Sequence, residues 1–197
     1  GTRSGDIDPG IIGYISEKEG ITAPRIISIL NRKSGIFGIT GKYTDRRDIV
    51  EAMKKGNKRA KLAFSIETYR IRKYIGAYMA SLQTVDAIVF TAGAGEKSSE
   101  LREASLNGLE KFGIKLDPKK NNKATSRNIE SIISSDDSEI KVFVIPTDEE
   151  IVFTEDVVAI LKGNYTGPHT YKYIFEYSSY RNKLREEAYK KERKVNE

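Results

Sequence analysis

Apolar side chains recur at helical spacing along the first half of the chain. The longest such pattern covers residues 57–82, where apolar positions form two separate stripes. A helix that is apolar on two faces is typical of one covered on both sides. We therefore expect a long central helix, about 39 Å in length at about 1.5 Å per residue.

Shorter helices are predicted before this one. The first should occupy residues 11–20, and the second should begin after Thr22, with Pro24 in its first turn. Residues 34–42 carry a glycine at every third position, which suits neither the helical nor the strand period. We expect this segment to be an irregular connection whose glycines permit close backbone packing.

The second half of the chain alternates between strand and helix patterns. Strands are expected at residues 87–90, 114–116, 129–135 and 141–145, and helices at residues 98–112 and from residue 147 onward. The polar residues 117–128 should form an exposed loop. Alternation of this kind predicts an α/β fold.

The composition fits a folded protein and excludes several kinds of chemistry. Hydrophobic residues make up 38% of the 197 residues, which is enough for a core. The sequence shows no signal-peptide pattern and no apolar run of membrane-spanning length, so we expect a cytoplasmic protein. Because there is no cysteine and only one histidine, His169, any chemistry must rest on carboxylates, arginines, lysines and backbone dipoles.

The net charge of +6 is concentrated near the C-terminal end. Residues 162–197 contain nine Lys and Arg against five Glu, so the other residues carry 25 basic against 23 acidic side chains. A basic tail can bind nucleic acid through its phosphates, and that hypothesis stays open for residues 163–197. The nearly neutral remainder is ordinary for a metabolic enzyme and does not favour nucleic acid as the partner.

A glycine-containing junction follows the strand expected at residues 87–90. Gly93 and Gly95 separate this strand from the next helix. Free backbone N–H groups and the positive end of a helix dipole would allow a nucleotide to lie against such a junction. Packing alone also explains many glycines at strand-to-helix turns, so the pattern leaves both interpretations open.

Arginines and carboxylates at three other places allow either a structural or a binding role. Arg3 is followed by Asp6 and Asp8, which could hold it in a surface ion pair or orient it toward a phosphate or carboxylate. Arg46 and Arg47 add positive charge to the start of a helix, a conflict that a phosphate or a stacking purine would relieve. Glu149 suits the first turn of a helix or a Mg²⁺ ion.

Four motifs stand in a fixed order along the chain. They are Gly1-Thr-Arg-Ser-Gly-Asp-Ile-Asp-Pro9, Thr44-Asp-Arg-Arg-Asp48, Phe90-Thr-Ala-Gly-Ala-Gly-Glu96 and Ile145-Pro-Thr-Asp-Glu-Glu150. In this order they resemble the C-terminal half of the acetate kinase family, over about residues 1–160 of this sequence. The resemblance implies an α/β fold of the ribonuclease H-like superfamily of actin, hexokinase and sugar kinases, with helices flanking a mixed sheet.

The same resemblance implies a reaction and a set of site residues. The reaction is reversible transfer of the γ-phosphoryl group of ATP to acetate, giving acetyl phosphate and ADP. Arg3 would contact the substrate carboxylate and stabilise the phosphoryl group in flight, and Glu149 would help to hold Mg²⁺ or Mn²⁺. The adenosine pocket and the nucleotide-binding loop would be formed by Asp45, Arg46, Arg47, Gly93, Ala94, Gly95, Glu96 and Lys97.

Three residues on the nucleotide side depart from the family pattern. Arg46 stands where the family usually has an aromatic residue, Ala94 where it has a bulky aliphatic residue, and Lys97 where it has an asparagine. All three belong to the expected nucleotide site. We therefore expect adenine packing and the choice of phosphate donor to differ most from the family.

The resemblance also implies a domain organisation. Residues 1–162 would form the nucleotide-binding and dimerisation domain of an acetate kinase, and residues 163–197 a basic extension made of a linker and a helix from Tyr177. The family places its catalytic histidines and acyl pocket in an N-terminal domain, and the loop-like start without methionine fits a preceding segment. We expect a homodimer that is inactive without that domain.

Three alternatives remain from the sequence. A propionate kinase of the same family would carry the same motifs, because the acyl pocket lies in the other domain. A non-catalytic module for dimerisation or nucleotide sensing would also fit. The third is the nucleic-acid binder that the basic residues 163–197 suggest.

Overall fold

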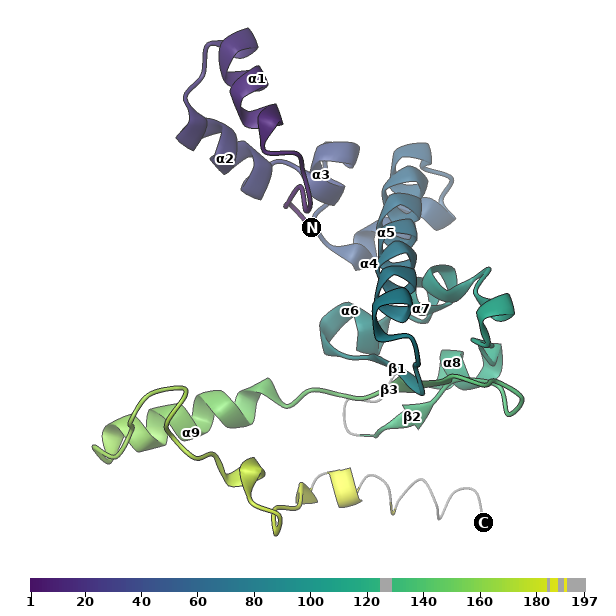
Figure 1. The fold of residues 1–197 in the computed structure, drawn as a ribbon, viewed down its shortest axis with the longest axis vertical. Helices are drawn as coiled ribbons and strands as arrows, with labels where there is room; N and C mark the ends of the chain where they lie inside the picture. The colour runs from purple at the N-terminus through teal and green to yellow at the C-terminus, as the bar shows by residue number, and fades with distance from the viewer. Residues whose placement is uncertain (125–128, 184, 188–189, 191–197) are drawn as a thin grey trace. The chain divides into compact units, whose positions relative to one another are not determined.

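The computed structural model describes residues 1–124, 129–183, 185–187 and 190, and these form two compact units (Figure 1). Unit 1 contains residues 1–85 and 100–107. Unit 2 contains residues 86–99 and the described residues from 108 onward. The expected division into residues 1–162 and an extension is a different one, and it stays a prediction.

Unit 1 is made of helices that begin where local signals predict. Thr22 precedes the second helix and Pro24 lies in its first turn. Asp45 and Asn57 cap the starts of two later helices, because each side chain accepts a hydrogen bond from a backbone N–H of the first turn. The helices are α1 (Gly10–Glu19), α2 (Ala23–Arg32), α3 (Gly35–Thr40), α4 (Arg46–Lys54), α5 (Lys58–Leu82) and most of α7 (Ser99–Leu106).

The expectation of an irregular connection over residues 34–42 is wrong, because α3 occupies most of it. The close packing expected of its glycines is present. Gly35 has φ +60°, and a Cβ at this position would lie 2.6 Å from the carbonyl oxygen of Arg3. The α3 turn therefore forms where residues 1–3 pass directly over it, a tertiary contact that the local glycine spacing does not reveal.

The long helix α5 was predicted correctly in extent but not in its surroundings. Its buried residues are Ala60, Ala63, Phe64 and Thr68. The second apolar stripe is open within unit 1, since Leu62 is 52% exposed. The expectation that α5 is covered on both faces is therefore wrong for unit 1.

Unit 2 is built on a three-stranded mixed sheet in the order β1-β3-β2 (Figure 1). Strand β1 (Ala87–Phe90) is parallel to β3 (Lys141–Val144), which is antiparallel to β2 (Ser131–Ile132). Phe90 is paired with Val144, so the segments that follow β1 and β3 both leave the sheet at the carboxyl ends of these parallel strands. The core of unit 2 includes Leu109, Ile114, Ile133, Ile140, Val142 and Val144.

Several helices and strands of residues 98–135 have other bounds than the sequence predicts. The helix expected at residues 98–112 ends at Leu106, because Gly108 takes φ +87° and a short 3-10 helix, η1 (Glu110–Phe112), follows. The strand expected at residues 114–116 is reduced to a single bridge between Leu116 and Ser134. The strand expected at residues 129–135 is ordered as β2 over only two of them.

Residues 118–123 form helix α8 (Pro118–Lys123) where an exposed loop was expected. Asp117 caps it by accepting hydrogen bonds from the backbone N–H groups of Lys119 and Lys120. Asn121 is fully buried and donates to the carbonyl oxygen of Ser99 at 2.9 Å. The polar composition of this segment concealed a capping signal, Asp followed by Pro, that is typical of a helix start.

Helix α9 (Glu149–Leu161) follows β3, and a short 3-10 helix, η2 (Ile174–Glu176), follows it. The helix expected from Tyr177 does not begin there, since residues 177–182 are not helical. Part of the expected range, at 184, 188–189 and 191–197, lies outside the described residues. Among the described residues, no helix is both long enough and apolar enough to cross a membrane.

Candidate functional site

Arg3 is held in place through its neighbours' backbone. The N–H of Ser4 donates to the carbonyl oxygen of Leu30 at 2.8 Å, and the carbonyl oxygen of Thr2 accepts from Ser34 N–H at 2.9 Å. Gly35 permits this close approach, since it has no Cβ. The backbone of residues 2–4 is therefore fixed between the end of α2 and the start of α3.

The hypothesis that Asp6 or Asp8 orients Arg3 is wrong. Asp6 lies 3.2 Å from the guanidinium of Arg70, and Asp8 accepts from the N–H of Gly10 at 2.8 Å. In the described part of the chain Arg3 is not in an ion pair, and it lies exposed. A guanidinium without a carboxylate partner remains able to bind an anionic ligand.

Arg3 lines a pocket of about 740 Å³ in unit 1. Its lining includes the cations Arg3, Lys33 and Arg70, and α5 contributes Glu67 together with isoleucines and tyrosines. Pockets that bind small molecules are typically apolar with a few polar groups at fixed positions. This pocket has that composition, and Arg3 is one of the charged residues that line it.

Asp45 and Arg47 form one structural pair at the start of α4. Asp45 accepts from the N–H of Arg47 at 2.8 Å, and the Nη2 of Arg47 lies 2.7 Å from Asp45 Oδ2. The Arg47 hydrogen bonds lower the pKa of Asp45 to about 2. Asp45 therefore caps α4, and its negative charge is kept at all ordinary pH values.

Arg46 has a different partner, Glu67, which no local sequence pattern indicates. Its Nε and Nη2 both lie close to Oε1 of Glu67 on α5, at 2.6 Å and 2.5 Å. The two residues are 21 positions apart, so no local spacing signals the pair. The charge conflict seen at the start of α4 is thus relieved by a carboxylate of the same unit.

The segment expected as a glycine loop is a short helix in unit 2. Helix α6 (Ala92–Lys97) contains Gly93, Ala94, Gly95, Glu96 and Lys97, so the loop expectation is wrong. A Cβ on Gly93 would meet nothing within 4 Å, and one on Gly95 would only touch Phe90 at 3.4 Å. Neither glycine is required by packing at its own position.

Glu96 connects α6 to the segment after β3. It is only 6% exposed, and its Oε1 accepts from both the N–H and the hydroxyl of Thr147, at 2.8 Å and 2.9 Å. A buried carboxylate with two donors is a strong contact. It fixes the two segments that leave the parallel strands β1 and β3 beside one another, where open α/β sheets bind ligands.

Glu149 lies in the first turn of α9 and is exposed. Its neighbour Asp148 accepts from Asn182 at 3.0 Å. Among the described residues no group of three or more His, Asp or Glu side chains could form a closed metal site. A single exposed carboxylate nevertheless fits Mg²⁺, which is commonly held by one or two carboxylates together with ligand phosphates and water.

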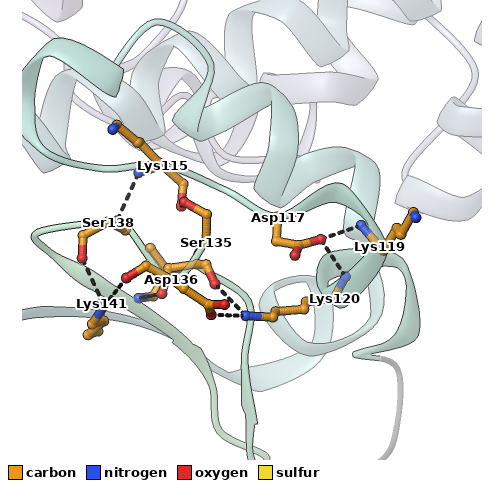
Figure 2. Close-up of polar contacts among 10 residues, drawn as sticks. Lys115, Asp117, Lys119, Lys120, Ser135, Asp136, Ser138 and Lys141 are labelled. Carbon is orange, nitrogen blue, oxygen red and sulfur yellow. Dashed lines mark hydrogen bonds and ion pairs between the residues drawn. The ribbon is translucent and has the colours of Figure 1, made fainter.

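A second cluster of charged residues in unit 2 serves structure (Figure 2). Lys120 lies 2.6 Å from Asp136 and lowers its pKa, while Lys141 donates to the carbonyl oxygens of Asp136 and Ser138. Asp117 caps α8 in the same network. Because these contacts engage Lys120 and Lys141 within the fold, the cluster does not supply the expected site.

The expected site residues therefore divide between the units. Arg3, Asp45, Arg46 and Arg47 belong to unit 1, whereas Gly93, Ala94, Gly95, Glu96, Lys97 and Glu149 belong to unit 2. Within unit 1, Arg46 is joined to α5. Within unit 2, Glu96 joins α6 to the segment that leads into Glu149.

Comparison with known proteins gives one consistent result. The sequence model of the Acetokinase family matches residues 1–155. An acetate kinase from Trichlorobacter lovleyi is 57% identical over 175 residues, which are 89% of this chain and 42% of that protein. The chain thus spans about two fifths of the length of this curated relative.

Solved structures agree with the sequence match. The crystal structure of Porphyromonas gingivalis acetate kinase superposes with a TM-score of 0.73 at 43% identity, over 81% of this chain and 40% of that one. A propionate kinase from Francisella tularensis gives a TM-score of 0.68 at 38% identity, over 76% of this chain and 37% of that one. The structural neighbours share the α/β architecture with a mixed sheet.

Proposed function

Because this chain belongs to the acetokinase family, we propose that it is the nucleotide-binding half of an acetate kinase and corresponds to that enzyme's C-terminal domain. The reaction would be phosphoryl transfer between ATP and acetate, giving ADP and acetyl phosphate. The coverage of about two fifths of each relative and the order of the four motifs support this assignment. The fold would be that of the ribonuclease H-like superfamily.

One observation carries the proposal most directly. The Glu96–Thr147 contact joins the Gly93–Gly95 segment to the segment that begins α9 with Glu149. Two segments expected on the nucleotide side thus meet at the carboxyl ends of the parallel strands β1 and β3. Open α/β sheets usually bind their ligands at this end of the strands.

Arg3 would stabilise the negative charge of the phosphoryl group in the transition state. Phosphoryl transfer passes through a loose, in-line transition state with charge on the equatorial oxygens, and a planar guanidinium can bind two of them. Arg3 suits this role because its backbone is fixed by residues 30–37 while its guanidinium is exposed beside a pocket. The same group would bind the acetate carboxylate.

Glu149 would hold Mg²⁺ together with the phosphates of the nucleotide. The ion, when bound, neutralises charge on the phosphate oxygens. The exposed position of Glu149 leaves it open to such a ligand.

The proposed active site would also need residues from the family's N-terminal domain. By the family pattern, the catalytic histidines and the acyl pocket belong to the N-terminal domain, and the enzyme is a homodimer. Propionate is the alternative acyl substrate, because a propionate kinase structure also matches this chain and the family's acyl pocket lies in the other domain. The second alternative is that the chain is not an enzyme and serves as a nucleotide-binding or dimerisation module.

The proposal is tested by supplying an acetate kinase N-terminal domain in trans with acetate and MgATP. Acetyl phosphate, trapped as its hydroxamate, should form only when both halves are present. Replacing acetate with propionate in the same assay separates the two acyl substrates. Binding of ATP without product would instead favour the non-catalytic module.

A further inference from the structure

After α9 the chain turns back and runs along that helix toward the start of it (Figure 1). We call residues 173–183 and 185–187 of this returning segment the C-terminal strap. The strap belongs to unit 2 and lies beyond residues 1–155, which the family model matches. None of the expected site residues belongs to it.

The first part of the strap is attached to the second half of α9. The hydroxyl of Tyr173 donates to Asp156 Oδ1 at 2.9 Å, and the N–H of Ile174 donates to Glu155 Oε2 at 3.0 Å. Tyr173 is buried, and its ring stacks on that of Phe175. A buried tyrosine whose hydroxyl is bonded to a carboxylate is a firm anchor, because it combines apolar burial with a charge-assisted hydrogen bond.

Asn182 attaches the second part of the strap to the start of α9. Its Nδ2 donates to Asp148 Oδ2 at 3.0 Å, and its Oδ1 accepts from the backbone N–H of Arg185 at 3.2 Å, which caps the helical residues that follow in the strap. Asp148 immediately precedes Glu149, and within the described part of the chain its side chain does not cap α9. The start of α9 therefore depends on contacts from elsewhere in unit 2.

Arg185 attaches the strap to the segment that leads from β3 into α9. Its Nη2 donates to the carbonyl oxygen of Pro146, and its Nη1 lies 3.0 Å from Oε1 of Glu130. The Arg185 side chain is partly buried, and salt screens such a charge less than a fully exposed one. Arg185 thus connects the strap to residues on both β3's exit and the approach to β2.

Each of the three residues before Glu149 is bonded to another part of unit 2. The pairs are Pro146 with Arg185, Thr147 with Glu96, and Asp148 with Asn182. Two of the three contacts therefore come from the strap. Contacts of this kind, one step behind a metal-binding carboxylate, orient it and strengthen its hold on the ion.

We propose that the C-terminal strap positions Glu149 for the Mg²⁺ ion and phosphates of the nucleotide. Asn182 and Arg185 are positioning residues that act through residues 146–148 and do not touch the ligand. The inference rests on the proposed function, because that function gives Glu149 its metal role. It adds to the site a segment beyond the residues that the family model matches.

The positioning can be tested first without ligand, by hydrogen exchange at the Thr147 amide of the 197-residue chain. Asn182→Asp can still cap the helical residues of the strap but places a second carboxylate against Asp148. This variant and Arg185→Ala should each accelerate exchange at Thr147 at least about tenfold, although Glu96 is unchanged, because each loses a hydrogen bond that involves a charged group.

Arg181→Ala is the matched control for both strap variants. The guanidinium of Arg181 donates to the carbonyl oxygens of Ser178 and Tyr180, which lie in its own part of the strap. Its removal takes away one positive charge of the strap, as Arg185→Ala does, without touching the start of α9. Exchange at Thr147 should therefore stay as in the wild type.

The role toward the metal is tested by comparing ADP with Mn²⁺–ADP, with bound Mn²⁺ followed by electron paramagnetic resonance. Asn182→Asp and Arg185→Ala should weaken Mn²⁺–ADP about tenfold, as expected for loss of an outer-shell contact, and should leave metal-free ADP unchanged. Glu149→Ala should show the same pattern. Asn182→Asp added to Glu149→Ala should weaken binding no further, because the strap acts through Glu149.

Each contrary outcome has a separate meaning. Unchanged exchange at Thr147 in both strap variants, or additive effects of Asn182→Asp and Glu149→Ala, would overturn the positioning role. If the wild type and both strap variants bind Mn²⁺–ADP equally well, the positioning role is wrong while the proposed function stands. If the folded wild-type chain binds neither ADP nor Mn²⁺–ADP, the nucleotide site and the role of the strap are both overturned.

Discussion

At the scale of single residues, the chain separates charges that hold the fold from charges that face a ligand. Asp45, Arg47, Glu67 and Glu96 have close protein partners, whereas Arg3 and Glu149 are exposed at the ends of helices or segments that fix their backbones. The sequence alone offered both interpretations for Arg3, Arg47 and Glu149. Only the partner of each side chain distinguishes the two.

Arg3→Ala in the complete enzyme should lower kcat at least about 100-fold, as is typical for loss of a group that stabilises transition-state charge. The measurement is steady-state formation of acetyl phosphate. Arg25→Ala, an exposed arginine on α2, is the control and should retain normal turnover. Near-normal turnover of the Arg3 variant would remove Arg3 from the catalytic residues.

Glu149→Ala should raise the Mg²⁺ concentration needed for half-maximal activity. The reason is that one of the few carboxylates available to the ion is lost. Glu150→Ala changes the next residue of the same helical turn and should have the smaller effect. Equal metal dependence in wild type and in Glu149→Ala would leave Glu149 as a helix-start residue only.

The Asp45 carboxylate predicts an acid-dependent loss of stability. Its pKa is lowered from 3.8 to about 2 by Arg47, so it stabilises the fold above pH 3.8 and loses that effect as the pH falls through about 2. Asp45→Asn can still cap α4 but cannot titrate. The difference in unfolding free energy between wild type and Asp45→Asn, measured in urea, should therefore shrink from pH 5 to pH 2; a constant difference would contradict the assignment.

At the scale of elements, local signals predicted where helices begin and failed where distant segments meet. The starts of α2 after Thr22 and of α5 at Asn57 were correctly placed, because the signals that begin a helix act within one turn. Helix α3 was missed because Gly35 packs against Arg3, far away in sequence. Helix α8 was missed because the polarity of its residues outweighed the Asp117 cap in the sequence analysis.

The candidate site shows the same limit. The resemblance named Asp45, Arg46 and Glu96, but no sequence pattern could give Glu67 as the partner of Arg46 or Thr147 as the partner of Glu96. These pairs join residues 21 and 51 positions apart. Their existence depends on how α4 lies on α5 and on how β1 lies beside β3.

The Glu96–Thr147 contact predicts a stability effect of its own. Glu96→Ala would remove the buried carboxylate that accepts from Thr147, and loss of a hydrogen bond to a charged group costs roughly 1.5–3 kcal/mol. Urea unfolding should show this loss, and hydrogen exchange at the Thr147 amide should accelerate. Glu139→Ala, an exposed acidic position of unit 2, should change neither; an unchanged Thr147 amide in Glu96→Ala would show that the contact does not hold the two segments together.

At the scale of the whole molecule, each unit carries part of the expected active site. Unit 1 contains the arginines and the pocket at Arg3, and unit 2 contains the glycine helix and Glu149. The mixed sheet and the long helix α5 were predicted from the sequence. The open apolar stripe on α5 was not, because periodicity shows which faces are apolar and not what covers them.

The central claim is that this chain supplies the nucleotide half of an acetate kinase active site. The most direct measurement is hydroxamate-trapped acetyl phosphate from one polypeptide that joins an acetate kinase N-terminal domain to this chain. With acetate and MgATP, we predict product at a rate that depends on both halves and that falls in the Arg3→Ala version. A folded polypeptide that binds ATP but makes no acyl phosphate from acetate or propionate would contradict the claim.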